Sequence, residues 1–458
     1  MMRHLAYLIL TTILVSSCST EETITFNQHV APIVHKQCAP CHRPGEAGPF
    51  NLISYQDVRK KAKMIAEVTQ DRYMPPWPAD PNYSSFLNQY YLSDEEIEII
   101  QTWVKQGANE GDSTLQVSYP KFNDNSFLGE PDLVLEMTDT VFIPGNNKDL
   151  FAAIKIPFSI PKDTFIRAVE FVPGNRKLVH HMNGHMILFQ DELKENPFVG
   201  DGHLFPDSIQ LSGKALADSV NSQLGLLHDD GTYPLLIPSV SNYLPGVLPQ
   251  VYPEGIGGYY MSKKGAFYLR NMHYGPSPIP SYDISKINVF YADKRPERPI
   301  QETQLGTLGV SRIEPKFVIE PEEIKTFRTE LYCTIDISIL TVNPHMHLLG
   351  KSFKAFAIKP NGDTIPLIHI PEWDFRWQFF YTYPKMVHIP KGSTIVAIGT
   401  FDNTSENPNN PFDPPRLVKP PTATTNMKTT DEMFQFIFNY LPYQEGDENI
   451  SLEVDQLN

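Results

Sequence analysis

The chain has 458 residues, 41% of them hydrophobic, and a formal net charge of −15 from 53 Asp and Glu against 38 Lys and Arg. This length is enough for about three globular domains, and the negative charge argues against nucleic acid or an anionic membrane surface as the partner. The 41 prolines favour short strands and loops over long helices, and four cysteines are too few for a disulfide framework.

The N-terminal segment, residues 1–17, is typical of a secretory leader. A basic start is followed by an apolar run from Leu5 to Val15 and a small-residue exit before Cys18. The run is too short for a stable transmembrane anchor. Its end resembles the bacterial lipobox, in which the cysteine is lipidated; an ordinary signal peptide is the alternative. We expect a lipid-anchored protein of the cell envelope, facing the periplasm or the surface, and Ser19 favours the outer membrane.

Residues 22–115 contain a haem-attachment motif. Cys38-Ala-Pro-Cys41-His42 has the C-x-x-C-H pattern, in which two thiols form thioethers with haem and the imidazole ligates iron. The alternative is a thioredoxin-like redox pair, which needs a strand–helix–strand context. Here the motif instead follows a predicted helix over residues 26–37, so one haem c is the preferred interpretation.

The second axial ligand of the haem is expected further along the chain. Met74, in the proline-stiffened segment Tyr73–Trp77, is the best candidate, and a thioether ligand would raise the haem potential. Met64 is the alternative, but it falls in a helical apolar pattern and is expected to be a core residue.

A capped helix closes this region. Ser93 and Glu96 form a capping-box pattern before an apolar helical face, and Gly107 is placed to end the helix. The order of helix, C-x-x-C-H motif, methionine loop and C-terminal helix resembles small class I cytochromes c. That resemblance implies a small all-α domain that transfers electrons.

Beyond residue 125 the sequence predicts antiparallel β-structure. Short alternating runs recur at Pro131–Met137, Lys286–Tyr291 and Thr334–Val342, bounded by Pro, Gly and Asn. More than 300 residues favour two sandwiches over one. We therefore expect a multidomain protein in which the cytochrome c-like domain precedes two all-β antiparallel, jelly-roll-like sandwiches, at residues 126–300 and 301–458.

Histidines gather in three short elements of the β-rich region. In the first, adjacent strand residues point to opposite faces, so His180 and His181 can bind one metal only with a bulge or local twist; without one, His181 and His185 share a face. The second element carries His273 before Tyr274 and Gly275.

The third element is Pro344-His345-Met346-His347, whose spacing places both imidazoles on one face of a strand. Each histidine taken singly could be an ordinary interior or surface residue. Together they indicate a metal site, although imidazole suits zinc, copper, iron and nickel alike.

The order His-His, His-Tyr-Gly, His-x-His and Asp-Glu-Met resembles the copper type II, ascorbate-dependent monooxygenases, the family of the peptidylglycine α-hydroxylating and dopamine β-monooxygenases. The resemblance extends over about 330 residues and includes further segments: Leu244–Gly246, Tyr252–Gly255, Trp373–Gln378, Asp402-Asn403 and Asn407–Pro411.

This resemblance implies two mononuclear coppers. The first would store an electron, and the second would bind O₂ and hydroxylate a substrate C–H bond; a soft thioether on the second favours Cu(I). Matched position by position, the ligands are His180, His181 and His273 for the first copper and His345, His347 and Met433 for the second.

The chain departs from the family pattern in three ways. Residues 182–184 are additional, so His185 could replace His180 or His181 as a ligand. Cys333 is the sole cysteine of the β-rich region, which excludes the disulfides of the animal enzymes. Asn343 and Ile437 stand where the peptide-amidating members hold the peptide carboxylate, so peptidylglycine is a poor candidate substrate.

We therefore predict a copper-dependent monooxygenase acting on an unidentified small-molecule or peptide substrate. An external donor would supply electrons, arriving through the attached haem. The main alternative is a non-catalytic electron-transfer or copper-binding lipoprotein, and a second is a haem enzyme such as a peroxidase, which would need an open axial position.

Overall fold

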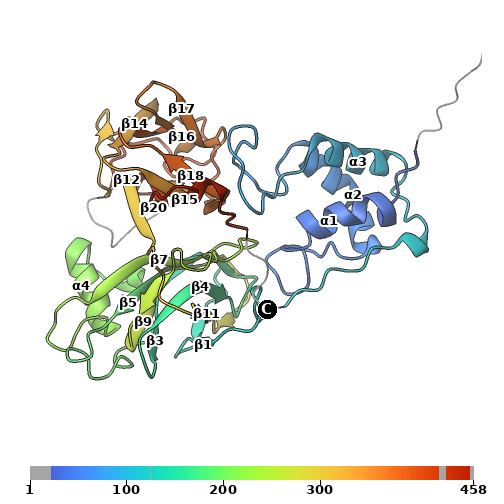
Figure 1. Cartoon of the computed structure of the whole chain (residues 1–458). Coiled ribbons are helices and arrows are strands. Elements are labelled where there is room, and N and C mark those ends of the chain that lie inside the picture. Colours follow the sequence, from blue (N-terminus) through green and yellow to red (C-terminus); the bar gives the residue numbers. More distant parts are fainter. Residues whose placement is uncertain (1–21, 124, 422–429, 454–458) are drawn as a thin grey trace, which may run out of the picture.

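The computed structural model describes residues 22–123, 125–421 and 430–453. It consists of an N-terminal helical part beside two β-sandwiches (Figure 1). The prediction of a mostly β protein is confirmed. The expected leader and Cys18 lie outside the described residues, and no helix in the described ranges is long and apolar enough to cross a bilayer.

The helical part contains a π-helical turn, three α-helices and a 3₁₀ turn. They are η1 (Phe26–Val30), α1 (Ala31–Gln37), α2 (Tyr55–Gln70), α3 (Asp94–Lys105) and η2 (Ser113–Leu115).

Sequence-encoded caps fix the ends of these helices. The capping box of α3 forms as predicted: the Ser93 hydroxyl accepts from the Glu96 N–H, and the Glu96 carboxylate accepts from the Ser93 N–H. Gly107 follows the helix with φ 95°. The expectation that Met64 is a core residue is wrong, because its side chain is 46% exposed while the neighbouring Ile65 is buried.

The first sandwich pairs the sheet β6-β3-β9-β5-β7 with the sheet β1-β11-β4-β8, and a small β10-β2 ribbon flanks them. The strands are β1 (Leu133–Glu136), β2 (Val141–Ile143), β3 (Leu150–Ser159), β4 (Thr164–Val172), β5 (Val179–Leu188), β6 (His203–Leu204), β7 (Leu235–Tyr243), β8 (Tyr259–Met261), β9 (Lys264–Tyr274), β10 (Ser281–Asp283) and β11 (Lys286–Tyr291). A 3₁₀ turn η3 (Pro206–Ser208) and helix α4 (Gly213–Gln223) lie between β6 and β7.

The second sandwich pairs the sheet β12-β20-β15-β18 with the sheet β13-β14-β19-β16-β17. Its elements are β12 (Gln301–Gly306), β13 (Ile313–Glu314), β14 (Ile324–Tyr332), β15 (Ile337–Met346), β16 (Gly350–Ile358), β17 (Thr364–Ile370), β18 (Tyr381–Ile389), β19 (Thr394–Asp402), β20 (Phe434–Pro442) and the 3₁₀ turn η4 (Asp447–Asn449).

The predicted strands agree with the observed ones in different degrees. The run Lys286–Tyr291 is strand β11, and the run Pro131–Met137 contains β1. The third run is displaced, since β15 begins at Ile337 and continues to Met346. The displacement arises because Cys333, which is buried, follows the end of β14 and precedes a turn into β15.

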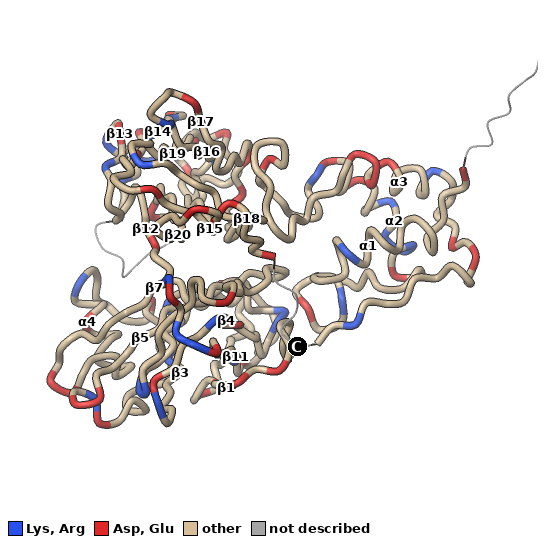
Figure 2. The backbone as a smooth tube through the Cα atoms, in the orientation of Figure 1, with Lys and Arg blue, Asp and Glu red and all other residues tan. Residues whose placement is uncertain are grey.

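The segment between α2 and α3 connects the helical part to the second sandwich (Figure 1). Trp77 packs on Phe379 and Tyr381, with ring centroids 5.5 and 5.3 Å away, and Ala79 and Phe86 are buried in the same core cluster as those rings. Lys and Arg are scattered among Asp and Glu over all three parts (Figure 2).

Candidate metal centres

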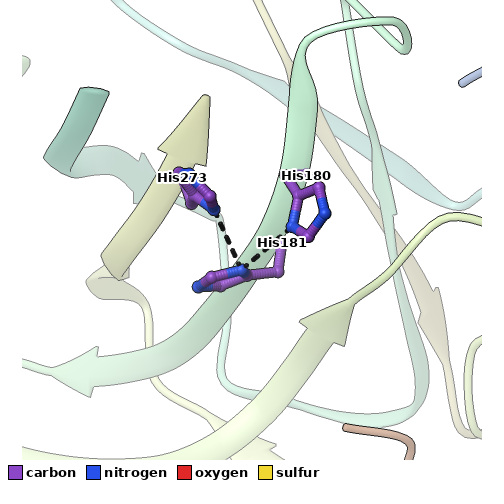
Figure 3. Close-up of side chains that lie close together, drawn as sticks. All are labelled: His180, His181 and His273. Atoms are coloured by element: carbon purple, nitrogen blue, oxygen red, sulfur yellow. Dashed lines mark hydrogen bonds between the residues drawn. The ribbon is translucent and has the colours of Figure 1, made fainter. Parts of the chain in front are cut away.

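A cluster of three imidazoles, called here the first cluster, forms on the first sandwich. His180 and His181 lie on β5 and His273 lies on β9 (Figure 3). His181 is paired across the ladder with His273, and the β5–β9 register shifts on both sides of His181. This irregularity is the bulge that the sequence required, and it allows two consecutive histidines to turn toward one point.

The spacing of the nitrogens in the first cluster suits one metal ion. The His181 Nδ1 lies 3.5 Å from the His180 Nδ1 and 3.3 Å from the His273 Nδ1, and the candidate ligand atoms all lie within 4.8 Å of one another. Two imidazole nitrogens bound at about 2.0–2.1 Å with near-tetrahedral angles lie roughly 3.3–3.4 Å apart. The residues therefore fit a mononuclear site.

Two neighbours orient the His273 ring. Its Nε2 lies 2.8 Å from the Asp149 carboxylate, which holds the proton on Nε2 and leaves the Nδ1 lone pair facing His181. Phe151 stacks on the ring at 4.4 Å with an interplanar angle of 9°. Neither neighbour was predicted, because both lie on or beside β3, far from the histidines in sequence.

The first cluster is neutral at physiological pH. Burial and the nearby His273 lower the pKa of His180 to about 4. Burial, together with the other histidines, holds the pKa of His181 well below its ordinary value. Burial also lowers the pKa of His273, although Asp149 opposes the shift. Neutral imidazole is the form that ligates a metal.

The second cluster comprises His345, His347 and Met433 on the second sandwich. The Nε2 atoms of His345 and His347 lie 3.1 Å apart, as the alternate spacing predicted. The Gln378 side-chain oxygen accepts from the His345 Nδ1, so the Nε2 keeps its lone pair. Burial lowers the pKa of His345 to about 4.

Met433 lies beside His347 through strand pairing and a shared carboxylate. Met346 pairs with Phe434, so His347 and Met433 are the next residues in register. The N–H groups of both donate to Glu432 Oε1, at 2.6 and 2.9 Å. Met433 is fully buried from solvent. Glu432, which no sequence motif marks as functional, thus links the backbones of His347 and Met433 in the second cluster.

His185 is separated from the first cluster. Its Nδ1 accepts from the Ser239 N–H at 3.2 Å, and its ring faces Tyr268 at 6.2 Å. Of the three ligand sets left open by the sequence, the structure brings together the one with His180 and His181.

The two clusters face one cavity between the sandwiches. His181 of the first cluster and His345 and His347 of the second line a cavity of about 90 Å³. Arg376 also lines it and donates to the Tyr73 hydroxyl at 3.1 Å. Tyr73, the residue before Met74, therefore contacts a residue that lines the cavity shared by the two clusters.

The C-x-x-C-H residues form a turn after α1. Cys38 and Cys41 are free thiols, and burial raises the pKa of Cys41 to about 11. The His42 Nδ1 donates to the Phe50 carbonyl at 3.0 Å, which leaves Nε2 as the possible ligand atom. These features fit thioether attachment and imidazole ligation of haem.

Cys41 lies against the first sandwich. A Cβ atom at Gly246, in the loop after β7, would stand 2.7 Å from the Cys41 Sγ, and the Tyr90 hydroxyl donates to the Gly246 carbonyl at 2.6 Å. Val247, the next residue, lines the cavity that the two clusters share. The motif is thus close to the wall of that cavity. Met74 is half-buried.

Comparisons with known proteins bear on part of the chain. Residues 304–410 match the family model of the copper type II ascorbate-dependent monooxygenase, C-terminal domain, a range that contains His345 and His347 but not Met433. No curated protein matches the chain. A solved structure of the infectious bursal disease virus Gt strain aligns at 11% identity over 70% of this chain and 74% of its own, with a TM-score of 0.17, too low to inform the fold.

Proposed function

We propose that this protein is a copper-dependent monooxygenase that hydroxylates a C–H bond of a small organic or peptide substrate with O₂. The observation that carries the proposal is the pair of clusters, one on each sandwich, facing a common cavity. The match of residues 304–410 supports copper as the metal, because imidazole spacing alone leaves other ions open.

In this proposal each cluster holds one copper. Bound copper would supply the one-electron redox chemistry that activates O₂. Asp149 and Gln378 keep His273 and His345 in the tautomers that ligate. The Met433 thioether gives the second cluster a soft donor, which favours Cu(I).

We also propose that electrons arrive from a haem c attached at Cys38 and Cys41, with His42 and Met74 as axial ligands. The motif chemistry supports attachment, since the thiols are free and the His42 Nδ1 is anchored. The external electron donor would then reduce the haem rather than the coppers directly.

Two contacts between the helical part and the sandwiches support this electron supply. Cys41 abuts Gly246, whose neighbour Val247 lines the shared cavity. Trp77 packs on Phe379, next in sequence to the residue that orients His345.

We further propose that the N-terminal leader directs the protein to the cell envelope. Lipidation at Cys18 would tether it to the cell envelope, facing the periplasm or the surface, with the outer membrane favoured by Ser19.

Metal stoichiometry tests the proposal. The full chain, matured with haem-attachment machinery and loaded with copper, should retain one iron and two coppers per chain after dialysis. His345→Ala and Met433→Ala should each lose one copper, and His273→Ala should lose the other. His203→Ala is the matched control, because His203 lies on β6 outside both clusters.

The outcomes separate the alternatives. Retention of two coppers with O₂ consumption by the reduced protein supports the monooxygenase. Two coppers without reaction with O₂ would indicate a non-catalytic electron-transfer or copper-binding lipoprotein. One iron and no retained copper would refute the proposal and leave a tethered cytochrome.

A further inference from the structure

A second cavity, of about 470 Å³, adjoins the second cluster. His345 and Met433 line it on the second sandwich, while His185 and Arg270 line it on the first. Its size is within the range of sites that enclose small organic ligands. It therefore offers space for a substrate beside the proposed hydroxylating copper.

Arg270 brings a positive charge into this cavity. It lies on β9 on the same strand face as Tyr268, and β5 pairs His185 with Tyr268. Among the residues that the structure describes, the Arg270 guanidinium has no hydrogen-bond or salt-bridge partner. It is the sole Arg or Lys among the residues that line the cavity.

The other polar groups of the cavity leave this charge unbalanced. His185 is neutral, since burial and the positive Arg270 lower its pKa to about 4. Glu302 is the one carboxylate in the lining, but it forms no ion pair with Arg270, and burial raises its pKa despite a hydrogen bond from Ser239. A partly buried guanidinium without a partner is costly unless a ligand supplies the anion.

Apolar side chains form much of the rest of the wall. Leu236, Leu308 and Tyr233 line the cavity and are 46%, 44% and 60% exposed, so they can accept the apolar body of a ligand. Phe380 and Ile437 add apolar surface near the second cluster.

From these features we propose that the 470 Å³ cavity binds an amphipathic organic anion, with its carboxylate on Arg270 and its apolar body toward His345 and Met433. This inference rests on the proposed function for the identity of the site, and it adds the substrate class. The anion would be held by the first sandwich, while the bond to be hydroxylated faces the second.

Calorimetric titration of the copper-loaded full chain tests this proposal with three probes of similar shape. They are 3-phenylpropanoate, 3-phenylpropanamide and 3-phenylpropylamine, which are negative, neutral and positive at pH 7. Wild type should bind the anion at least tenfold more tightly than the amide, because a charge-assisted bidentate contact is stronger than a neutral one. Arg270→Gln should abolish the preference and leave amide affinity within about twofold, whereas Arg270→Lys should retain part of it.

A second measurement locates the probe. Cu(II) should broaden the proton signals of bound 3-phenylpropanoate, and His345→Ala, which removes the nearby copper, should remove most of the broadening. Tightest binding of the amine, or an anion preference that persists in Arg270→Gln, would overturn the inference.

Failure of the inference and failure of the proposed function can be told apart. Two retained coppers with no effect of Arg270→Gln would refute the substrate class alone. An Arg270-dependent anion preference in a chain that retains no copper would refute the monooxygenase while keeping the anion site.

Discussion

Asp149 should tune the copper affinity of the first cluster without being a ligand. Its carboxylate accepts from the His273 Nε2 at 2.8 Å, and such a partner typically changes metal affinity by about 10–100-fold. That range corresponds to about 1.4–2.7 kcal/mol. The Asp149 side chain is 54% exposed, so water screens the interaction and the lower end applies, about tenfold.

Two substitutions separate the charge from the hydrogen bond. Asp149→Asn keeps an acceptor and loses the charge, so its first-site affinity should fall less than that of Asp149→Ala, which loses both. Competition with a coloured Cu(I) chelator measures both affinities. Asp163→Asn is a matched control, because Asp163 is an exposed carboxylate of the same sandwich that binds Tyr260 and Lys263 instead of a histidine.

The second cluster provides an internal reference for this prediction, since Asp149 does not contact it. Its affinity should stay constant in every Asp149 variant. Unchanged first-site affinity in a folded Asp149→Ala protein would refute the reasoning, and an equal loss at both sites would indicate a general structural defect instead.

Three further predictions concern the haem contacts and stability. Met74→Ala should slow the reduction of copper in stopped-flow experiments with the copper count unchanged; an unaltered rate would argue against Met74 as a haem ligand. Gly246→Val should displace Cys41, because a Cβ there stands 2.7 Å from its sulfur, and haem oxidation by Cu(II) should slow while the haem content stays at one per chain. Burial disfavours the ionised form of Asp447, but hydrogen bonds, chiefly from Arg298, more than offset burial and lower the pKa of this carboxyl. Ionised Asp447 therefore stabilises the folded protein above the unfolded-state pKa, and this stabilisation disappears as the pH falls through the lower folded-state pKa. Denaturant titrations of Asp447→Asn should therefore show a smaller loss of stability on acidification than wild type, and equal slopes would contradict this.

The sequence predicted features that depend on contiguous residues. The capping box at Ser93 forms because the two groups are three residues apart on one helical turn. His345 and His347 approach to 3.1 Å because alternate residues of a strand share a face. Strand β11 matches its predicted bounds, Lys286–Tyr291, and this run is rich in β-branched and aromatic residues.

The sequence interpretation was wrong or incomplete at two places. Met64 lies outside the buried face of α2: at about 100° per residue it is turned away from Val58, Ala62 and Ile65, which are buried, and it is 46% exposed. Whether His185 replaces His180 or His181 as a ligand also could not be decided, since a bulge changes which residues share a face and leaves no reliable mark on the local pattern.

The sequence by itself determined the chemistry that short motifs carry: a C-x-x-C-H turn, paired imidazoles, a helix cap and alternating strands. Tertiary structure decided how those groups meet. His181 and His273 are 92 residues apart and are joined by one strand ladder, while Asp149 and Arg270 reach the sites from strands or loops with no motif of their own. The physical reason is that a local pattern fixes which face a side chain occupies, whereas the packing of whole sheets fixes which faces enclose a common cavity.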